Sequence, residues 1–306
     1  MDDNMWVATY KNGLFRIDKS TKNIRRWDTE NSNLDHNVIF NLSFRPEENS
    51  LWIATDGRGI QNYDIATDSF SSIVNSADPE SLSSDSVLCF FKDELNNMWI
   101  GTQYGGINIS NALFSQYNPM NSFNGLTNNR VKCFLEYSKE LIFIGTDGGG
   151  LSVHDRKDNS VEGVNLGNYK NLHINSLFKK RDGSILIGTY GHGLLEYNPN
   201  NSRTKNLIKE WTFGNNDAGR FIQDAIEFND LIIFGTPYGL YSINKKNQIE
   251  KILLNNPDAL LDSYQLNSIK CLALQNNRVW VGTKAGFASL DVEGEDFILN
   301  YFKVVG

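Results

Sequence analysis

One phrase recurs seven times with strand-like segments around each copy, and this predicts an all-β fold: a seven-bladed β-propeller of four-stranded antiparallel blades. The copies read MWVATYKNG at 5–13, LWIATDGRG at 51–59, MWIGTQYGG at 98–106, FIGTDGGG at 143–150, LIGTYGHG at 186–193, IFGTPYG at 233–239 and VWVGTKAG at 279–286. Their threonines lie 43–47 residues apart, a period typical of propellers. Radially repeated sheets form one unit, so we expect residues 1–306 to be a single domain.

Each repeat is expected to contain four short strands, A to D. Strand A is an alternating apolar segment such as 87–91, strand B ends in the threonine, and a glycine-rich turn leads into strand C. Strand D is more variable and is expected at 24–27, 70–74, 207–213 and 297–302. Only six A strands accompany the seven B–C units. We therefore expect an incomplete first blade and a chain that is a fragment of a longer protein, with a true three-stranded blade as the alternative.

The repeating residues are expected to be framework. Tryptophans occupy one B-strand position in four repeats, as packing between blades requires: Trp6, Trp52, Trp99 and Trp280. The threonine hydroxyl is expected to bond to local backbone groups. The three cysteines, Cys89, Cys133 and Cys271, each lie two residues after a β-branched residue, so we expect one equivalent, buried position for all three.

Composition excludes several classes of function. The net charge of −7 is opposite to that of a nucleic-acid-binding surface. The sequence contains no run of about 18 apolar residues, so we expect no direct membrane insertion by this chain. No signal peptide is visible. The four histidines are scattered without metal-ligand spacing and are expected to be solvated or structural. The glycine runs lack the lysine of a phosphate loop. We expect no metal site, no cofactor and no enzymatic activity in this chain.

The phrase W-I-G-T-x-x-G-G, preceded by an N-x-V strand, resembles the two-component regulator propeller repeat. Residues 78–87 with 98–102 are especially similar to it, and 31–38 are a second good copy. The turns at 237–239 and 284–286 depart from the pattern, being a residue short. The resemblance implies a periplasmic sensor module of a hybrid histidine kinase that recognises oligosaccharides from polysaccharide breakdown. It also implies a second propeller, membrane and kinase domains in the full-length protein, and contacts within a sensor homodimer.

Binding is expected where the repeat varies. In antiparallel blades the B–C turns and the D–A connections share one face, and loops on a rigid scaffold commonly carry binding. The B–C turns place tyrosines beside charged and amide groups, which suits a sugar, while lysine and arginine suit a carboxylate or sulfate. The candidate ligand-binding residues are Tyr10, Lys11, Asp56, Arg58, Gln103, Tyr104, Asp147, Tyr190, His192, Tyr238 and Lys284.

Two other functions remain open. A propeller that serves as a protein-interaction scaffold would expose an apolar patch on one face. A propeller lyase or hydrolase needs a cluster of histidine or carboxylate groups in neighbouring blades, and only Asp56 and Asp147 approach that pattern, two repeats apart.

Overall fold

The computed structural model describes residues 4–18, 20–21, 23–110, 114–117, 125–208, 218–252, 267–275, 278–293 and 296–303. The chain divides into two compact units, which are described separately. Unit 1 comprises Met1–Thr146 and Ser152–Gly163, and unit 2 comprises Asp147–Leu151 and Val164–Gly306. No helix within these described ranges is long and apolar enough to cross a bilayer.

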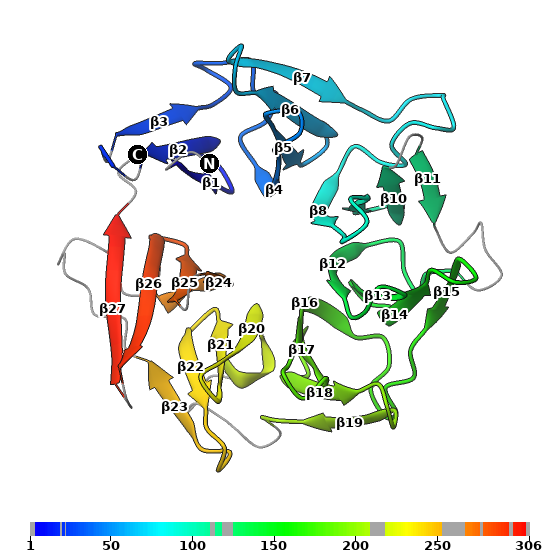
Figure 1. Ribbon diagram of the computed structural model, residues 1–306, viewed down its shortest axis with the longest axis vertical. Coiled ribbons are helices and arrows are strands. Elements are labelled where there is room, and N and C mark those ends of the chain that lie inside the picture. The colour runs from blue at the N-terminus through cyan, green and yellow to red at the C-terminus, as the bar shows by residue number, and fades with distance from the viewer. Residues whose placement is uncertain are drawn as a thin grey trace. The chain divides into compact units, whose positions relative to one another are not determined.

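Unit 1 holds the first four blades (Figure 1). Blade 1 contains β1 (Asn4–Ala8), β2 (Leu14–Asp18) and β3 (Ile24–Trp27). Blade 2 contains β4 (Ile39–Arg45), β5 (Ser50–Thr55), β6 (Ile60–Asp64) and β7 (Ser69–Ile73). Blade 3 contains β8 (Val87–Lys92), β9 (Met98–Thr102), β10 (Ile107–Ser110) and β11 (Phe114–Tyr117). Blade 4 contains β12 (Val131–Glu136), β13 (Leu141–Thr146), β14 (Gly150–Asp155), which begins in unit 2, and β15 (Ser160–Gly163).

Unit 2 holds the other three blades. Blade 5 contains β16 (His173–Lys179), β17 (Ile185–Tyr190), β18 (Leu194–Asn198) and β19 (Arg203–Asn206). Blade 6 contains β20 (Asp224–Phe228), β21 (Leu231–Thr236), β22 (Gly239–Ile243) and β23 (Ile249–Ile252), and the short 3-10 helix Ala218–Arg220 precedes it. Blade 7 contains β24 (Ile269–Gln275), β25 (Arg278–Thr283), β26 (Gly286–Glu293) and β27 (Asp296–Lys303).

The expected fold class, an all-β seven-bladed propeller of antiparallel blades, is confirmed, and the first blade has three strands. One strand expectation was wrong: strand D of blade 5 is β19, not 207–213. The Asn206 side-chain oxygen accepts the N–H of Ile208 at 2.8 Å, and this Asx turn ends the strand. Residues 209–213 lie outside the described ranges.

The A strands share a β-bulge at one position. The pairing of strands A and B shifts between Ile39/Asn41, Val87/Cys89, Val131/Cys133, Ile174/Ser176 and Ile269/Cys271. The residue after each bulge then lies opposite the alanine or glycine that precedes the repeated threonine. In blade 6 the pairing is regular, and Asp224 lies opposite Gly235.

The cysteines occupy the expected equivalent positions, opposite Gly101, Gly145 and Gly282. The expectation that all three are buried was wrong: only Cys89 is buried, Cys133 is partly buried and Cys271 is exposed. Cys89 lies beneath the next blade, 3.7 Å from the carbonyl oxygen of Val131. Burial at this position therefore depends on the neighbouring A strand, which the pattern of one repeat does not specify.

The B-strand glycine is required by close packing between blades. A Cβ on Gly235 would lie 2.3 Å from Cγ2 and 2.8 Å from Cβ of Ile269, on the A strand of the next blade. The β-branched Ile269 is fully buried and has little rotamer freedom with which to move aside.

Gly235→Ala is therefore expected to lower the free energy of unfolding by about 1–3 kcal/mol, because an extra methyl overpacks the contact between blades 6 and 7. Chemical denaturation measures the change. The control is Ala54→Gly, at the equivalent position of blade 2, which removes a methyl that this blade accommodates and is expected to cost only about 1 kcal/mol. Equal stability of Gly235→Ala and the parent chain would contradict the packing argument.

The repeated threonine has the expected backbone role in six repeats. Its hydroxyl donates to the carbonyl of the residue that closes the turn: Thr9 to Gly13, Thr55 to Gly59, Thr102 to Gly106, Thr189 to Gly193, Thr236 to Gly239 and Thr283 to Gly286. In blade 4 the Thr146 hydroxyl lies 3.4 Å from the hydroxyl of Thr127.

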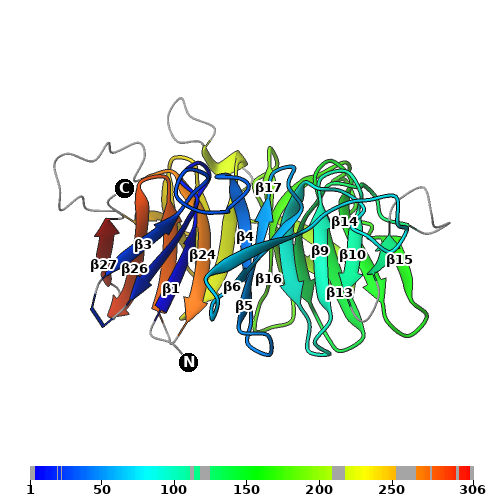
Figure 2. The same ribbon diagram turned by 90° about the horizontal axis from the view of Figure 1, so that it is seen from above.

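The B–C turn of one blade is bonded to the loop that enters the next blade. A turn glycine donates its N–H to a carbonyl just before the next A strand, as from Gly13 to Asn37, Gly59 to Asp85, Gly106 to Asn129, Gly148 and Gly150 to Leu172, and Gly191 and Gly193 to Arg220. Within each unit, B–C turns and D–A connections therefore gather at one end of the strands, and A–B turns at the other (Figure 2). We call the first end the loop face of that unit.

A buried ionic cluster joins blades 3 and 4 in unit 1. Arg156 donates to Asp93 at 2.5 Å and to Glu136 at 2.8 Å. The Asp93 side chain has no solvent exposure and also accepts the indole N–H of Trp99 at 2.8 Å.

The repeated tryptophans differ in burial. Trp99 and Trp52 are buried as expected, whereas Trp6 and Trp280 are only half-buried.

Candidate functional site

The loop faces carry a set of exposed tyrosines. Tyr10, Tyr104, Tyr190 and Tyr238, all in B–C turns, are 65%, 68%, 55% and 38% exposed. Six of the candidate residues lie in unit 1 (Tyr10, Lys11, Asp56, Arg58, Gln103 and Tyr104) and five in unit 2 (Asp147, Tyr190, His192, Tyr238 and Lys284). A large aromatic ring left in water on a rigid turn is available for stacking against a ligand.

In unit 1 the structure brings together candidates from two neighbouring turns. The Ser86 hydroxyl bonds to Asp56 at 3.1 Å and to the Gln103 amide oxygen at 3.2 Å, so it links the turns of blades 2 and 3. The Gln103 amide nitrogen donates to the phenol oxygen of Tyr104 at 2.6 Å. In blade 1, Tyr10 packs against Phe40 with ring centroids 6.4 Å apart. Lys11 and Arg58 are exposed beside these groups.

In unit 2 the B–C turn of blade 4 holds an aspartate–histidine pair. Asp147 and His173 form an isolated antiparallel bridge, and the imidazole Nδ1 lies 2.5 Å from the Asp147 carboxylate. The Asp147 side chain is 16% exposed, whereas that of His173 is 51% exposed. The carboxylate is thus mostly covered, while the imidazole it holds faces solvent.

Aromatic rings continue from His173 along the loop face of unit 2. His173 is paired with Tyr190 across β16 and β17, with ring centroids 6.4 Å apart. Tyr190 packs in turn on Phe221, with centroids 4.6 Å apart, and these two residues form a second antiparallel bridge. His192 meets Tyr169 edge to face at 6.3 Å.

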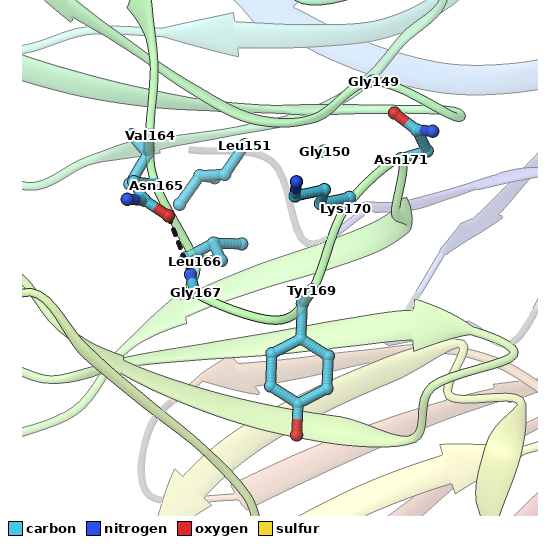
Figure 3. A pocket seen from close by; sticks show the side chains of 10 residues that line it. All are labelled: Gly149, Gly150, Leu151, Val164, Asn165, Leu166, Gly167, Tyr169, Lys170 and Asn171. Atoms are coloured by element: carbon cyan, nitrogen blue, oxygen red, sulfur yellow. Dashed lines mark hydrogen bonds between the residues drawn. The ribbon is translucent and has the colours of Figure 1, made fainter.

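A pocket of about 220 Å³ lies on the other side of the fourth turn. It is lined by Gly149, Gly150, Leu151, Val164, Asn165, Leu166, Gly167, Tyr169, Lys170 and Asn171. Figure 3 shows the Lys170 side chain extending toward Leu151, and the Tyr169 ring pointing away from the glycines. Lys170 and the two asparagines supply the polar side chains of its lining.

The remaining candidates stand apart from this group. Tyr238 and Lys284 lie in the short turns of blades 6 and 7, where their backbone N–H groups bond to Thr236 and Ser268. Burial and the nearby charge of Lys284 lower the pKa of Lys270. Within the described part of the chain, no group of three or more histidine, cysteine or acidic side chains is placed to hold a metal ion.

Sequence reasoning missed three residues of the unit 2 group: Tyr169, His173 and Phe221. Each lies in the D–A connection or at the first residues of strand A, next to the B–C turn of a neighbouring blade. The four histidines were expected to be solvated or structural, and buried His154, packed on Trp99, fits that expectation. The signal that could have identified these residues is their position in the repeat, because a residue directly before strand A lies beside the B–C turn of the preceding blade.

The strand order defines a seven-bladed β-propeller whose B–C turns vary in sequence from blade to blade. A family model described as the two-component regulator propeller matches residues 81–104, which confirms the resemblance found around 78–87 and 98–102. The chain thus carries a two-component regulator propeller repeat.

Similar proteins extend this finding. Histidine kinase P4 of Formosa agariphila is 27% identical over 296 residues, covering 88% of this chain and 20% of the kinase. The extracellular domain of a hybrid two-component system of B. thetaiotaomicron superposes with a TM-score of 0.74 at 23% identity, over 94% of this chain and 39% of that one. Virginiamycin B lyase from Staphylococcus aureus gives 0.61 at 11% identity, over 87% and 85%. The two structural likenesses show the fold, and this chain spans about a fifth of the curated kinase.

Proposed function

We propose that this chain is the ligand-sensing propeller of a two-component regulator, acts outside the cytoplasm, and binds an oligosaccharide released from a polysaccharide. The repeat match, the similarity to a histidine kinase and the likeness to an extracellular domain support this assignment. In this proposal residues 1–306 are one domain, and a second propeller, a membrane segment and a kinase belong to the longer protein. The chain itself contributes recognition, not catalysis.

The observation that carries the proposal is the placement of the exposed tyrosines. The B–C turns share their framework bonds, yet four of them project a tyrosine into solvent beside amide or ionisable side chains. Aromatic faces stack on the apolar face of a sugar ring, and the neighbouring polar groups bond to its hydroxyls. Lys11, Arg58 and Lys284 add cations that would hold a carboxylate or sulfate substituent.

The geometry also gives a route for a signal. The B–C turns of blades 1 to 5 are hydrogen-bonded to the loop entering the next blade, so a ligand that contacts one of these turns also acts on the connection between two blades. Binding would then favour one arrangement of the attached domains over another, as in rigid-body switching. Such a shift would change the contacts within a sensor dimer.

Calorimetric titration with a panel of short, defined oligosaccharides tests the proposal. We expect a variant with Tyr10, Tyr104, Tyr190 and Tyr238 all changed to alanine to bind at least about a hundredfold more weakly, since each stacked ring contributes about 1 kcal/mol. The control variant changes Phe44 and Leu95, exposed apolar residues of unit 1 away from its B–C turns, to alanine. Equal binding by the tyrosine variant and the parent chain, or loss of binding in the control, would contradict the proposal.

A further inference from the structure

We infer that one neutral pyranose ring of the ligand binds at the loop face of unit 2, on the aromatic pair Tyr190–Phe221 and against the imidazole of His173. Asp147 acts there as a positioning residue. This inference rests on the proposed function and narrows it to one place and one class of ring. We call Asp147, His173, Tyr190 and Phe221 the His173 site.

Asp147 determines what His173 presents to a ligand. An ionised carboxylate only accepts hydrogen bonds, so the ring nitrogen 2.5 Å from Asp147 carries the proton. In the neutral imidazole Nε2 is then unprotonated. Because half of the side chain is exposed, Nε2 can accept a hydrogen bond from a group on the solvent side. The backbone bridge between the two residues holds the ring in place.

An acceptor at this position selects its partner by chemistry. A sugar hydroxyl donates a hydrogen bond to Nε2, whereas a carboxylate or sulfate oxygen has no proton to donate. The charge of Asp147, directly behind the imidazole, also repels an anion at the same position. The site therefore favours a neutral ring over an acidic one.

Tyr190 and Phe221 supply the stacking surface. Their rings are 4.6 Å apart and their backbones form a bridge, so the pair is held by the strand ends of blades 5 and 6. Tyr190 is more than half exposed, and His173 lies across from it in the β16–β17 register. A ring stacked on Tyr190 therefore has the imidazole beside it, the arrangement that sugar recognition requires.

The fourth turn connects this site to the pocket. Asp147 lies on the side of His173, while Gly149 and Gly150 of the same turn line the pocket. A second ring of the oligosaccharide would contact the pocket wall and Lys170, which belong to the same loop face.

Two measurements test the inference. The first is ¹⁵N NMR of the imidazoles in the unliganded chain at about pH 8.5, where a histidine of ordinary pKa is neutral. We expect His173 to carry its proton on Nδ1, and Asp147→Asn to move it toward Nε2. A parent chain with the proton mainly on Nε2 would overturn the inference whatever ligand is found.

The second measurement is calorimetric titration of neutral and uronate oligosaccharides into single variants. We expect about tenfold or greater loss of affinity for the neutral ligand in Tyr190→Ala and in His173→Phe, which keeps a ring and deletes the acceptor. Asp147→Asn is expected to weaken binding together with its change of tautomer. Phe44→Ala, which removes an exposed aromatic ring of unit 1 away from its B–C turns, is the control and is expected to stay within about twofold.

The outcomes separate the two proposals. If the parent chain binds the ligand but Tyr190→Ala and His173→Phe bind equally well, the His173 site is wrong and the sensing function stands. Preference for uronates over neutral rings would also overturn the site. If no oligosaccharide binds the parent chain, the proposed function fails, and the inference fails with it.

Discussion

Replacing Arg156 with methionine is expected to lower the free energy of unfolding by about 3–5 kcal/mol. Arg156 is the charged partner of Asp93, whose side chain is fully buried between blades 3 and 4 of unit 1. Burial raises the pKa of Asp93, but hydrogen bonds from Trp99, Asn97 and Arg156 outweigh it and hold that pKa below its ordinary value. The carboxylate therefore stays ionised, and without Arg156 it is a buried charge that lacks its counterion.

Chemical denaturation with two optical probes measures this loss, because two probes reveal whether unfolding is a single transition. The control is Lys245→Met, which breaks an ion pair of similar length with Asp230 at 2.9 Å whose side chains are both mostly exposed. Exposed pairs contribute about 0–1 kcal/mol, so this variant is expected to unfold almost as the parent chain does. An Arg156→Met variant no less stable than the control would show that the cluster does not hold the blades.

Asp224 is expected to make the protein less stable as the pH rises from about 5 to about 8. Burial raises the pKa of this carboxyl to about 6, although backbone N–H groups of Leu272 and Ala225 and the Ser176 hydroxyl favour the ionised form. The residue lies where other blades have asparagine, serine or cysteine, opposite the B-strand glycine. A carboxyl thus occupies a position that elsewhere holds a neutral side chain.

The direction follows from proton linkage. A folded-state pKa of about 6 lies above the ordinary 3.8, so the folded protein binds this proton more tightly than the unfolded chain. Its contribution is therefore most favourable at pH below 3.8 and is lost as the pH rises through about 6, by a total of about 3 kcal/mol.

Unfolding free energies of the parent chain and Asp224→Asn, measured between about pH 5 and pH 8, test this expectation. The difference between the two proteins should change by about 1–1.5 kcal/mol across the range, with the parent relatively more stable at the acidic end. Asp230→Asn is the control, because hydrogen bonding to Lys245 lowers the pKa of Asp230 and places its titration below this range. A flat difference for Asp224→Asn would show that the carboxyl is not buried as the structure has it.

Much of the fold was predictable because it repeats. The threonines recur at a regular period, and the hydroxyl bond of the turn is determined inside one repeat. The fourth strand of blade 5 was placed wrongly because a turn at a single side chain, Asn206, ends the strand before residue 207, where it was expected to begin. Local hydrogen bonding of this kind is weakly marked in a pattern of apolar residues.

The candidate site was predicted only in part, because it depends on which blades become neighbours. Tyr190 and Asp147 were identified from their turns, but His173 becomes significant only once its backbone bridges to Asp147, 26 residues earlier. Phe221 likewise matters through its bridge to Tyr190. The burial of Cys89 has the same origin, since its thiol lies against Val131 of the next A strand.

The most direct test of the account is a crystal structure of the chain with an oligosaccharide that binds it. The account predicts a sugar ring on the loop face, stacked on Tyr190 with a hydroxyl at Nε2 of His173, and with the repeated Trp and Thr residues untouched. A sugar bound at the opposite strand ends, near Leu95, would contradict the claim that recognition belongs to the turn residues that vary between repeats.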